Sequence, residues 1–98
     1  MSKRPSKGDV LDITYEHVDN GEQKIEGVEV LNVVDCEEKF NDMDYIEQVT
    51  SYKIECDHPK SSWYFVILVA DEATFVIEIN PDTAEEENLG GHAEWEIV

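Results

Sequence analysis

Apolar and polar residues alternate along much of this chain, which is the pattern of half-buried β-strands. The alternation is most regular over residues 10–18, whose apolar positions are Leu11, Ile13 and Tyr15. Asn20-Gly21 follows, and this pair favours a hairpin because both residues tolerate positive φ. The return strand is expected over residues 23–34, with a kink at Gly27 and a bulge or bend near its end.

Four further strands are predicted, over residues 49–56, 63–69, 74–79 and 93–97. Residues 63–69 are apolar on both faces, which is typical of a central strand. In the next strand we expect Phe75, Ile77 and Ile79 to face inward and Glu78 to face outward. Residues 80–92, with three consecutive glutamates and Gly90-Gly91, are expected to be irregular, and the last short strand then closes the sheet at its edge.

Residues 35–47 break the alternation, and Phe40, Met43 and Ile46 recur there at a helical spacing. A short helix and a compact loop explain this stretch equally well. Valine and isoleucine outnumber leucine by 19 to 4, which favours strands over helices. We therefore predict an all-β fold, or β with one short helix, as a small antiparallel barrel or rolled sheet of about six strands. A sheet covered by one helix from residues 36–48 is the alternative.

The length of 98 residues allows one domain, expected over residues 9–98 behind a flexible basic arm, residues 1–8. The arm holds three of the seven cations, so residues 8–98 hold four cations against all 24 acids, a net charge of −20. Such a body repels nucleic-acid phosphates and anionic membranes, so direct binding to either through the folded surface is not expected. The arm lacks the apolar stretch of a secretory signal, and we expect a cytoplasmic protein.

The excess of acid has three explanations. Acid clusters such as Glu85-Glu86-Glu87 repel one another until salt is concentrated, since the screening length falls from about 8 Å at physiological ionic strength to about 3 Å at 1 M. The surface is therefore adapted to a salt-rich cytoplasm, or imitates the phosphates of a nucleic acid, or only maintains solubility. Six lysines against one arginine fit the salt explanation poorly.

Residues 2–18, SKRPSKGDVLDITYEHV, contain a Pro-x-Lys-Gly-Asp entry into the first strand. Together with the acid-rich composition, this segment resembles uncharacterised small acidic proteins of salt-loving archaea. The resemblance covers about a sixth of the chain. It implies a salt-rich environment and transfers no site residues.

Cysteine and histidine provide the candidate metal site. Cys56 and His58 share a face if their strand continues, and Cys36 with His17 or His92 would complete a zinc set. The spacing matches no standard zinc motif, so a buried Cys56 and a turn at His58 are the simpler interpretation. A Cys36–Cys56 disulfide is a further alternative, although nothing indicates an oxidising compartment. Acids flank both thiols, which argues against a nucleophilic cysteine.

Other chemistries receive no support from the sequence. With 24 acids in 98 residues, paired carboxylates arise by chance and indicate no acid–base site. Asp42-x-Asp44 resembles part of a calcium loop but lacks its glycine and its length. There is no Gly-x-Ser-x-Gly and no phosphate-binding glycine loop. We therefore expect no enzyme activity and no cofactor.

Aromatic residues in the strands are the candidate interaction residues, namely Tyr15, Tyr52, Trp63, Tyr64 and Trp95. They form an exposed stripe or fill the core. Because residues 63–69 are apolar on both faces, one face needs cover from a protein partner or a second copy of the chain. The expected function is thus a non-catalytic protein-interaction or assembly module adapted to high salt. The alternatives are a nucleic-acid-mimicking inhibitor of a DNA- or RNA-binding protein and a small metal protein using Cys and His.

Overall fold

The structure, a computed structural model, describes residues 3–35, 39–41, 47–59, 62–70 and 73–98. These residues form seven strands and no helix: β1 (Val10–His17), β2 (Gly21–Asp35), β3 (Lys39–Asn41), β4 (Glu47–Asp57), β5 (Tyr64–Ala70), β6 (Thr74–Ile79) and β7 (Glu86–Ile97). The all-β prediction is confirmed. The question of helix or loop over residues 36–48 concerns mostly residues outside the described ones, apart from β3 and the first residues of β4.

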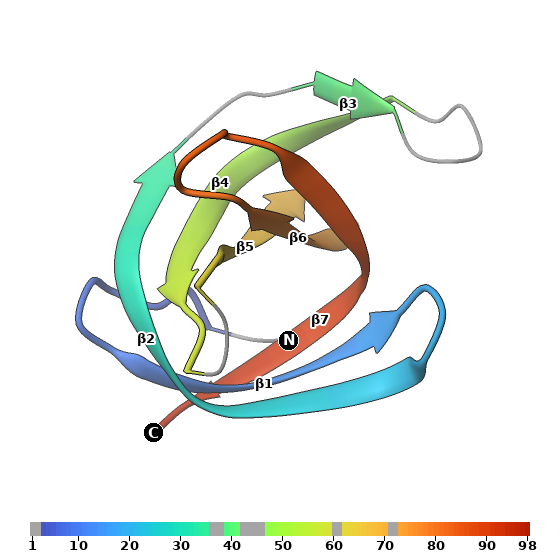
Figure 1. The fold of residues 1–98 in the computed structure, drawn as a ribbon. Helices are drawn as coiled ribbons and strands as arrows, with labels where there is room; N and C mark the ends of the chain where they lie inside the picture. The colour runs from blue at the N-terminus through green and yellow to red at the C-terminus, as the bar shows by residue number, and fades with distance from the viewer. Residues whose placement is uncertain (1–2, 36–38, 42–46, 60–61, 71–72) are drawn as a thin grey trace.

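Six of the strands close into an antiparallel barrel (Figure 1). Around the ring the order is β2, β1, β7, β6, β5, β4, and the pairing of β4 with β2 completes the circle. β3 pairs only with β4, outside the ring. The last strand therefore lies between β1 and β6 rather than at an edge as predicted. Closure pairs the second half of β2 with β4, an edge that a rolled sheet would leave open.

β2 bends, and this allows it to pair with two different strands of the barrel. Its first half pairs with β1 and its second half with β4. The register against β1 shifts near Gly27, which has φ of 71°, and the register against β4 shifts between Val30 and Asn32. Both irregularities lie where the sequence predicted a kink and a bulge. Bulges sharpen the local twist, and this allows one strand to pair with two neighbours.

The first hairpin also forms as predicted, with β1 and β2 joined through residues 18–20. The ring of His17 caps this turn, because its Nδ1 accepts hydrogen bonds from the backbone N–H groups of Asp19 at 3.0 Å and Asn20 at 3.3 Å. Gly21 has φ of 72°, whereas Asn20 has no positive φ. The turn is thus longer than the two-residue type that Asn-Gly favours most.

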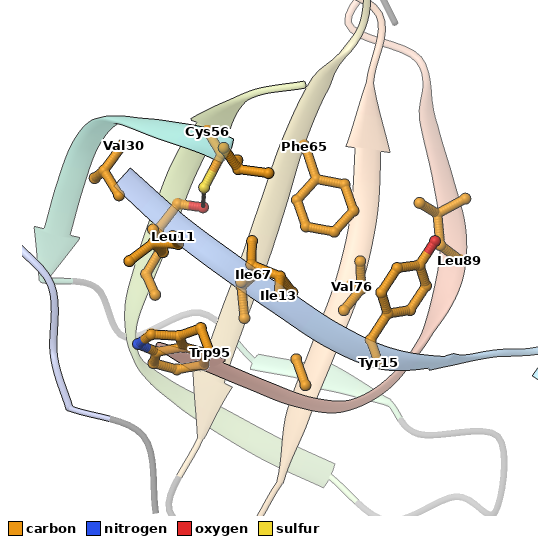
Figure 2. Close-up of a cluster of buried hydrophobic side chains, with 13 residues drawn as sticks. Leu11, Ile13, Tyr15, Val30, Cys56, Phe65, Ile67, Val76, Leu89 and Trp95 are labelled. Atoms are coloured by element: carbon orange, nitrogen blue, oxygen red, sulfur yellow. Dashed lines mark hydrogen bonds between the residues drawn. The ribbon is translucent and has the colours of Figure 1, made fainter. Parts of the chain in front are cut away.

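Inward-facing side chains from every strand of the barrel meet in one core (Figure 2). The members with no more than 1% exposure are Leu11, Ile13, Val28, Val30, Ile54, Cys56, Phe65, Ile67 and Val76. Tyr15 lies beside Phe65, with ring centroids 5.7 Å apart. Burying this apolar area is the main driving force for folding.

The orientation predicted for β6 is wrong. Val76 lies in the core opposite Ile67, so Phe75, Ile77 and Ile79 face outward. Glu78 faces the interior side instead, and its carboxylate adds to the rise that burial causes in the pKa of Tyr15. Apolar residues occupy both faces of this strand, so alternation alone did not identify the buried one.

The prediction of an irregular segment over residues 80–92 is also wrong in its second half. The turn is confined to residues 80–85, where the Asn80 side chain accepts hydrogen bonds from the backbone of Asp82 and Thr83. β7 begins at Glu86 and continues through Gly90-Gly91 to Ile97. Glycines and a positive φ at His92 interrupt its alternation, which hid the strand in the sequence.

The segment before β1 contacts the barrel. Trp95 Nε1–H donates a hydrogen bond to the Lys3 carbonyl oxygen at 2.7 Å, and Pro5 is buried. The Arg4 guanidinium lies 2.8 Å from the Asp35 carboxylate and 4.6 Å from the centroid of the Tyr52 ring. The basic residues Lys3 and Arg4, assigned from the sequence to a flexible arm, thus have defined partners on the barrel.

Candidate protein-interaction surface

The hairpin of β5 and β6 carries apolar side chains on the outside of the barrel. Because directly paired residues share a face of the sheet, the register defines three outward pairs. These pairs are Tyr64 with Ile79, Val66 with Ile77, and Leu68 with Phe75. We call these six residues the β5–β6 face.

The β5–β6 face contributes little to the interior. The buried core cluster includes Phe65, Ile67 and Val76 from this hairpin, and none of the six outward residues. Tyr64 is 43% exposed, Val66 is buried, and the other four are half-buried. Exposed apolar surface on the outside of a barrel is a common mark of a surface that meets another molecule, and here Tyr64 supplies the exposed part.

Polar and charged residues border this face on both sides. On β4, the positions opposite the outward residues of β5 are Lys53, Glu55 and Asp57. On β7, Glu86 and Asn88 lie opposite Ile79 and Ile77, while Gly91, which has no side chain, lies opposite Phe75. An apolar centre with a polar rim is the arrangement seen at protein–protein interfaces.

A hollow of about 590 Å³ opens at the β7 side of the face. Leu68, Phe75 and Ile77 form its apolar wall, while Glu16 and His92 lie on the opposite side. These five side chains come from four strands or their ends. The hollow therefore extends the β5–β6 face toward the carboxylates of β1.

Two glycines in the lining of this hollow allow neighbouring backbones to approach closely. A Cβ on Gly91 would lie 2.8 Å from the Thr74 carbonyl oxygen, and a Cβ on Gly90 would overlap the carbonyl oxygen of Glu16. Gly90 also has φ of 151°, which L-residues rarely adopt. The close approach of three backbones thus requires glycine at both positions, and the resulting gap lies between Phe75 and Glu16.

Beyond the hollow, the outer face of β1 and its neighbours is acidic. Glu16 is opposite Glu22 on β2, and Asp12 is opposite Glu96 on β7. Between these two like-charge pairs, Thr14 is flanked by Lys24 and Glu94. The acids are therefore distributed unevenly, since an acidic face on β1, β2 and β7 adjoins an apolar face on β5 and β6.

The five aromatic candidates do not form one stripe. Tyr15 and Trp95 lie in the core at 7% and 6% exposure, and Tyr52 packs against the core from its margin. Trp63 is half-buried just before β5. Tyr64 alone of the five is exposed, and it lies on the β5–β6 face.

The cysteine and histidine candidates are not brought together in the described residues. Cys56 is fully buried in the core, where burial and then the Glu55 carboxylate raise the pKa of its thiol to about 12. Such a thiol is a poor nucleophile and a poor metal ligand, because both roles need the thiolate. The His58 ring lies beside Phe65, with centroids 5.9 Å apart. Cys36 lies outside the described residues.

No group of three His, Cys, Asp or Glu side chains suited to a metal ion occurs in the part of the chain that the structure describes. His92 Nε2 is 3.8 Å from a Glu16 carboxylate oxygen, but no third His, Cys, Asp or Glu of the described residues completes a metal site with this pair. Asp42 and Asp44 of the partial calcium motif lie outside the described residues. In the described ranges, no helix is able to cross a lipid bilayer.

Sequence reasoning missed most residues of this surface. It assigned Phe75, Ile77 and Ile79 to the core, and it treated Glu16 as an ordinary outward acid of the first strand. The available signal was the apolar character of residues 63–69 on both faces, which indicated that one side of this hairpin needs cover. That signal located the surface on β5 but did not extend it to β6 and β7.

Comparison of the chain with protein-family models, with curated proteins and with solved structures gives no match.

Proposed function

We propose that this chain is a non-catalytic interaction module, adapted to high salt in the cytoplasm, that binds another protein through the β5–β6 face. The observation that carries the proposal is the set of three apolar cross-strand pairs on the outside of a closed barrel. None of the six belongs to the buried cluster inside the barrel, although Val66 is itself buried, and Tyr64 at one end of the face is exposed. Burial of such side chains against a partner is favourable by about 25 cal/mol per Å² of apolar surface.

Closure of the barrel also bears on how a partner docks. Strand addition at a sheet edge needs unpaired backbone groups, whereas β5 lies between β4 and β6, and β6 lies between β5 and β7. Recognition through side chains of the β5–β6 face therefore replaces the edge-strand mode. Tyr64 supplies an aromatic ring at one end of the face, and aromatic residues are enriched at the centres of interfaces.

Site-specific photo-crosslinking tests this proposal. A photoreactive phenylalanine analogue replaces Tyr64 in the producing cells, and a matched variant carries it at Thr14 on the acidic face. We expect one adduct of defined mass from Tyr64, none from Thr14, and loss of the adduct when Leu68→Glu is added. A second copy of this chain in the adduct supports assembly through the same face. Equal capture from both positions, or capture that survives Leu68→Glu, contradicts the proposal.

A second candidate function rests on the acidic face. Its like-charge pairs, Glu16 with Glu22 and Asp12 with Glu96, are arranged side by side on neighbouring strands, as a phosphate mimic would need. Such an inhibitor would compete with a labelled DNA duplex for a basic DNA-binding protein, and charge reversal at Glu22 and Glu96 would weaken the competition. If the chain leaves the DNA complex intact at 0.15 M salt, this candidate is excluded.

A further inference from the structure

One row of side chains crosses four strands and changes from apolar to acidic along its length. Leu68 pairs with Phe75, Phe75 pairs with Gly91, and Gly91 pairs with Glu16. Neighbouring strands are about 4.8 Å apart, so the backbones of Phe75 and Glu16 are separated by roughly 10 Å. Only the backbone of a glycine lies between them, and this is where the hollow opens.

The dimensions and chemistry of this gap suit one kind of side chain. Lysine and arginine place a positive head at the end of three or four methylene groups, and the methylenes favour apolar contact while the head favours a carboxylate. In this hollow, methylenes would lie against Leu68 and Phe75 and the head would lie near Glu16, with Glu86 also in the lining. Glu16 has His92 as a weak neighbour at 3.8 Å, and 64% of its side chain is exposed, so its carboxylate is accessible.

We infer that the hollow over Gly90 and Gly91 receives a lysine or arginine side chain of the protein that docks on the β5–β6 face. This inference rests on the proposed function and names the chemistry of its partner: a segment in which a cation adjoins apolar residues. The apolar residues cover the outward pairs of β5 and β6, and the cation enters the hollow. The geometry requires both features in one segment, because the row is continuous.

A second copy of the chain fits this requirement less well than a basic protein, because of its net charge. Each copy carries a charge of −17, so two copies repel each other wherever their acidic faces approach. A cationic partner is instead attracted by the same charge, which also raises the rate of encounter at low salt. At low salt, charge complementarity therefore favours a basic partner over self-association for this face.

Peptide binding followed by NMR tests the inference on the full chain. The probes are three capped heptapeptides in which leucine alternates with lysine, with glutamate or with serine, and a fourth in which serine alternates with lysine. They are titrated into ¹⁵N-labelled protein at the lowest KCl concentration that keeps it folded. We expect the Leu/Lys peptide to shift the amide signals of Thr74, Phe75, Gly91 and His92 saturably, and the other three to bind at least tenfold more weakly.

The matched variants are Glu16→Gln and Glu22→Gln. Both remove one exposed acid from the same row, but only Glu16 lines the hollow. We expect Glu16→Gln to weaken the Leu/Lys peptide by about three- to tenfold, which corresponds to about 0.7–1.4 kcal/mol, and Glu22→Gln to weaken it less than twofold. Equal losses in the two variants overturn the inference, as does a Ser/Lys peptide that binds as well as Leu/Lys.

The outcomes also separate this inference from the proposed function. If a heterologous adduct forms at Tyr64 but the Leu/Lys peptide produces no saturable shifts at the hollow, the cation inference fails alone. If the adduct is a second copy of this chain, the interaction face stands and the basic partner is wrong. If neither experiment detects binding on the β5–β6 face, both proposals fail.

Discussion

Glu96 and Asp12 lie directly opposite each other on the outer face of the β1–β7 pair. Like charges in this position are destabilising. Two unit charges about 6 Å apart repel by about 0.7 kcal/mol in water before screening. With a screening length of about 8 Å at physiological ionic strength, this falls to about 0.3 kcal/mol, and with about 3 Å at 1 M salt it falls to about 0.1 kcal/mol.

Glu96→Lys converts this repulsion into an attraction of similar size. We therefore expect the variant to gain about 1 kcal/mol in free energy of unfolding at 0.01 M KCl, about 0.7 at 0.15 M and about 0.2 at 1 M. Glu94→Lys is the matched control, because it makes the same change in net charge on the same strand but lies opposite Thr14 and in a row with Lys24.

Urea unfolding, followed by the fluorescence of Trp63 and the buried Trp95, measures both variants without changing the ionic strength. The quantity that matters is the gain of Glu96→Lys over Glu94→Lys at each KCl concentration. A difference near zero, or one that is as large at 1 M as at 0.01 M, would refute the assignment of repulsion to this pair. The unmodified chain should itself become more stable as KCl rises, because its excess of acid is progressively screened.

Three further predictions concern the core. In the folded chain the pKa of the Cys56 thiol is about 12, against 9.0 for an ordinary thiol. The unfolded chain therefore releases this proton first, and the free energy of unfolding falls as pH rises from about 9 toward 12. In Cys56→Ala this fall should be smaller between about pH 8 and 9.5, before tyrosines titrate. Val76 lies in the core and Ile77 faces outward. In urea unfolding, Val76→Ala should therefore lower the free energy of unfolding by about 2 kcal/mol, and Ile77→Ala by less than half of that. Equal losses would argue against the register of β6. Trp95→Phe keeps an aromatic ring but removes the hydrogen bond to the Lys3 carbonyl, which should lower the free energy of unfolding by about 1 kcal/mol; an unchanged unfolding midpoint would mean that this bond contributes nothing.

The first hairpin was predictable because only one of its faces is apolar. Leu11, Ile13 and Tyr15 leave no choice of buried face, and Asn20-Gly21 marks the turn. The bulges of β2 were also visible, since Gly27 and the run after Val30 interrupt the alternation. Where one face is buried and the other solvated, local pattern and global fold agree.

The β5–β6 hairpin was not predictable in the same way. Both of its faces are apolar, so a slip of one residue exchanges two equally plausible sets, and the pattern favoured Phe75 and Ile77 over Val76. The hollow was hidden for another reason. Phe75, Gly91 and Glu16 are far apart in the sequence, and only the pairing of β6 with β7 and of β7 with β1 brings them into one row.

The neighbouring positions of β1 and β7 in the ring have a consequence for synthesis of the protein. β1 leaves the ribosome first and β7 last, so Leu11 and Ile13 remain without Trp95 on the β7 side until translation of the barrel is complete. Pairings between such distant segments are slow to form, and unpaired apolar strands aggregate readily. The negative charge of the chains opposes their association during the interval before closure.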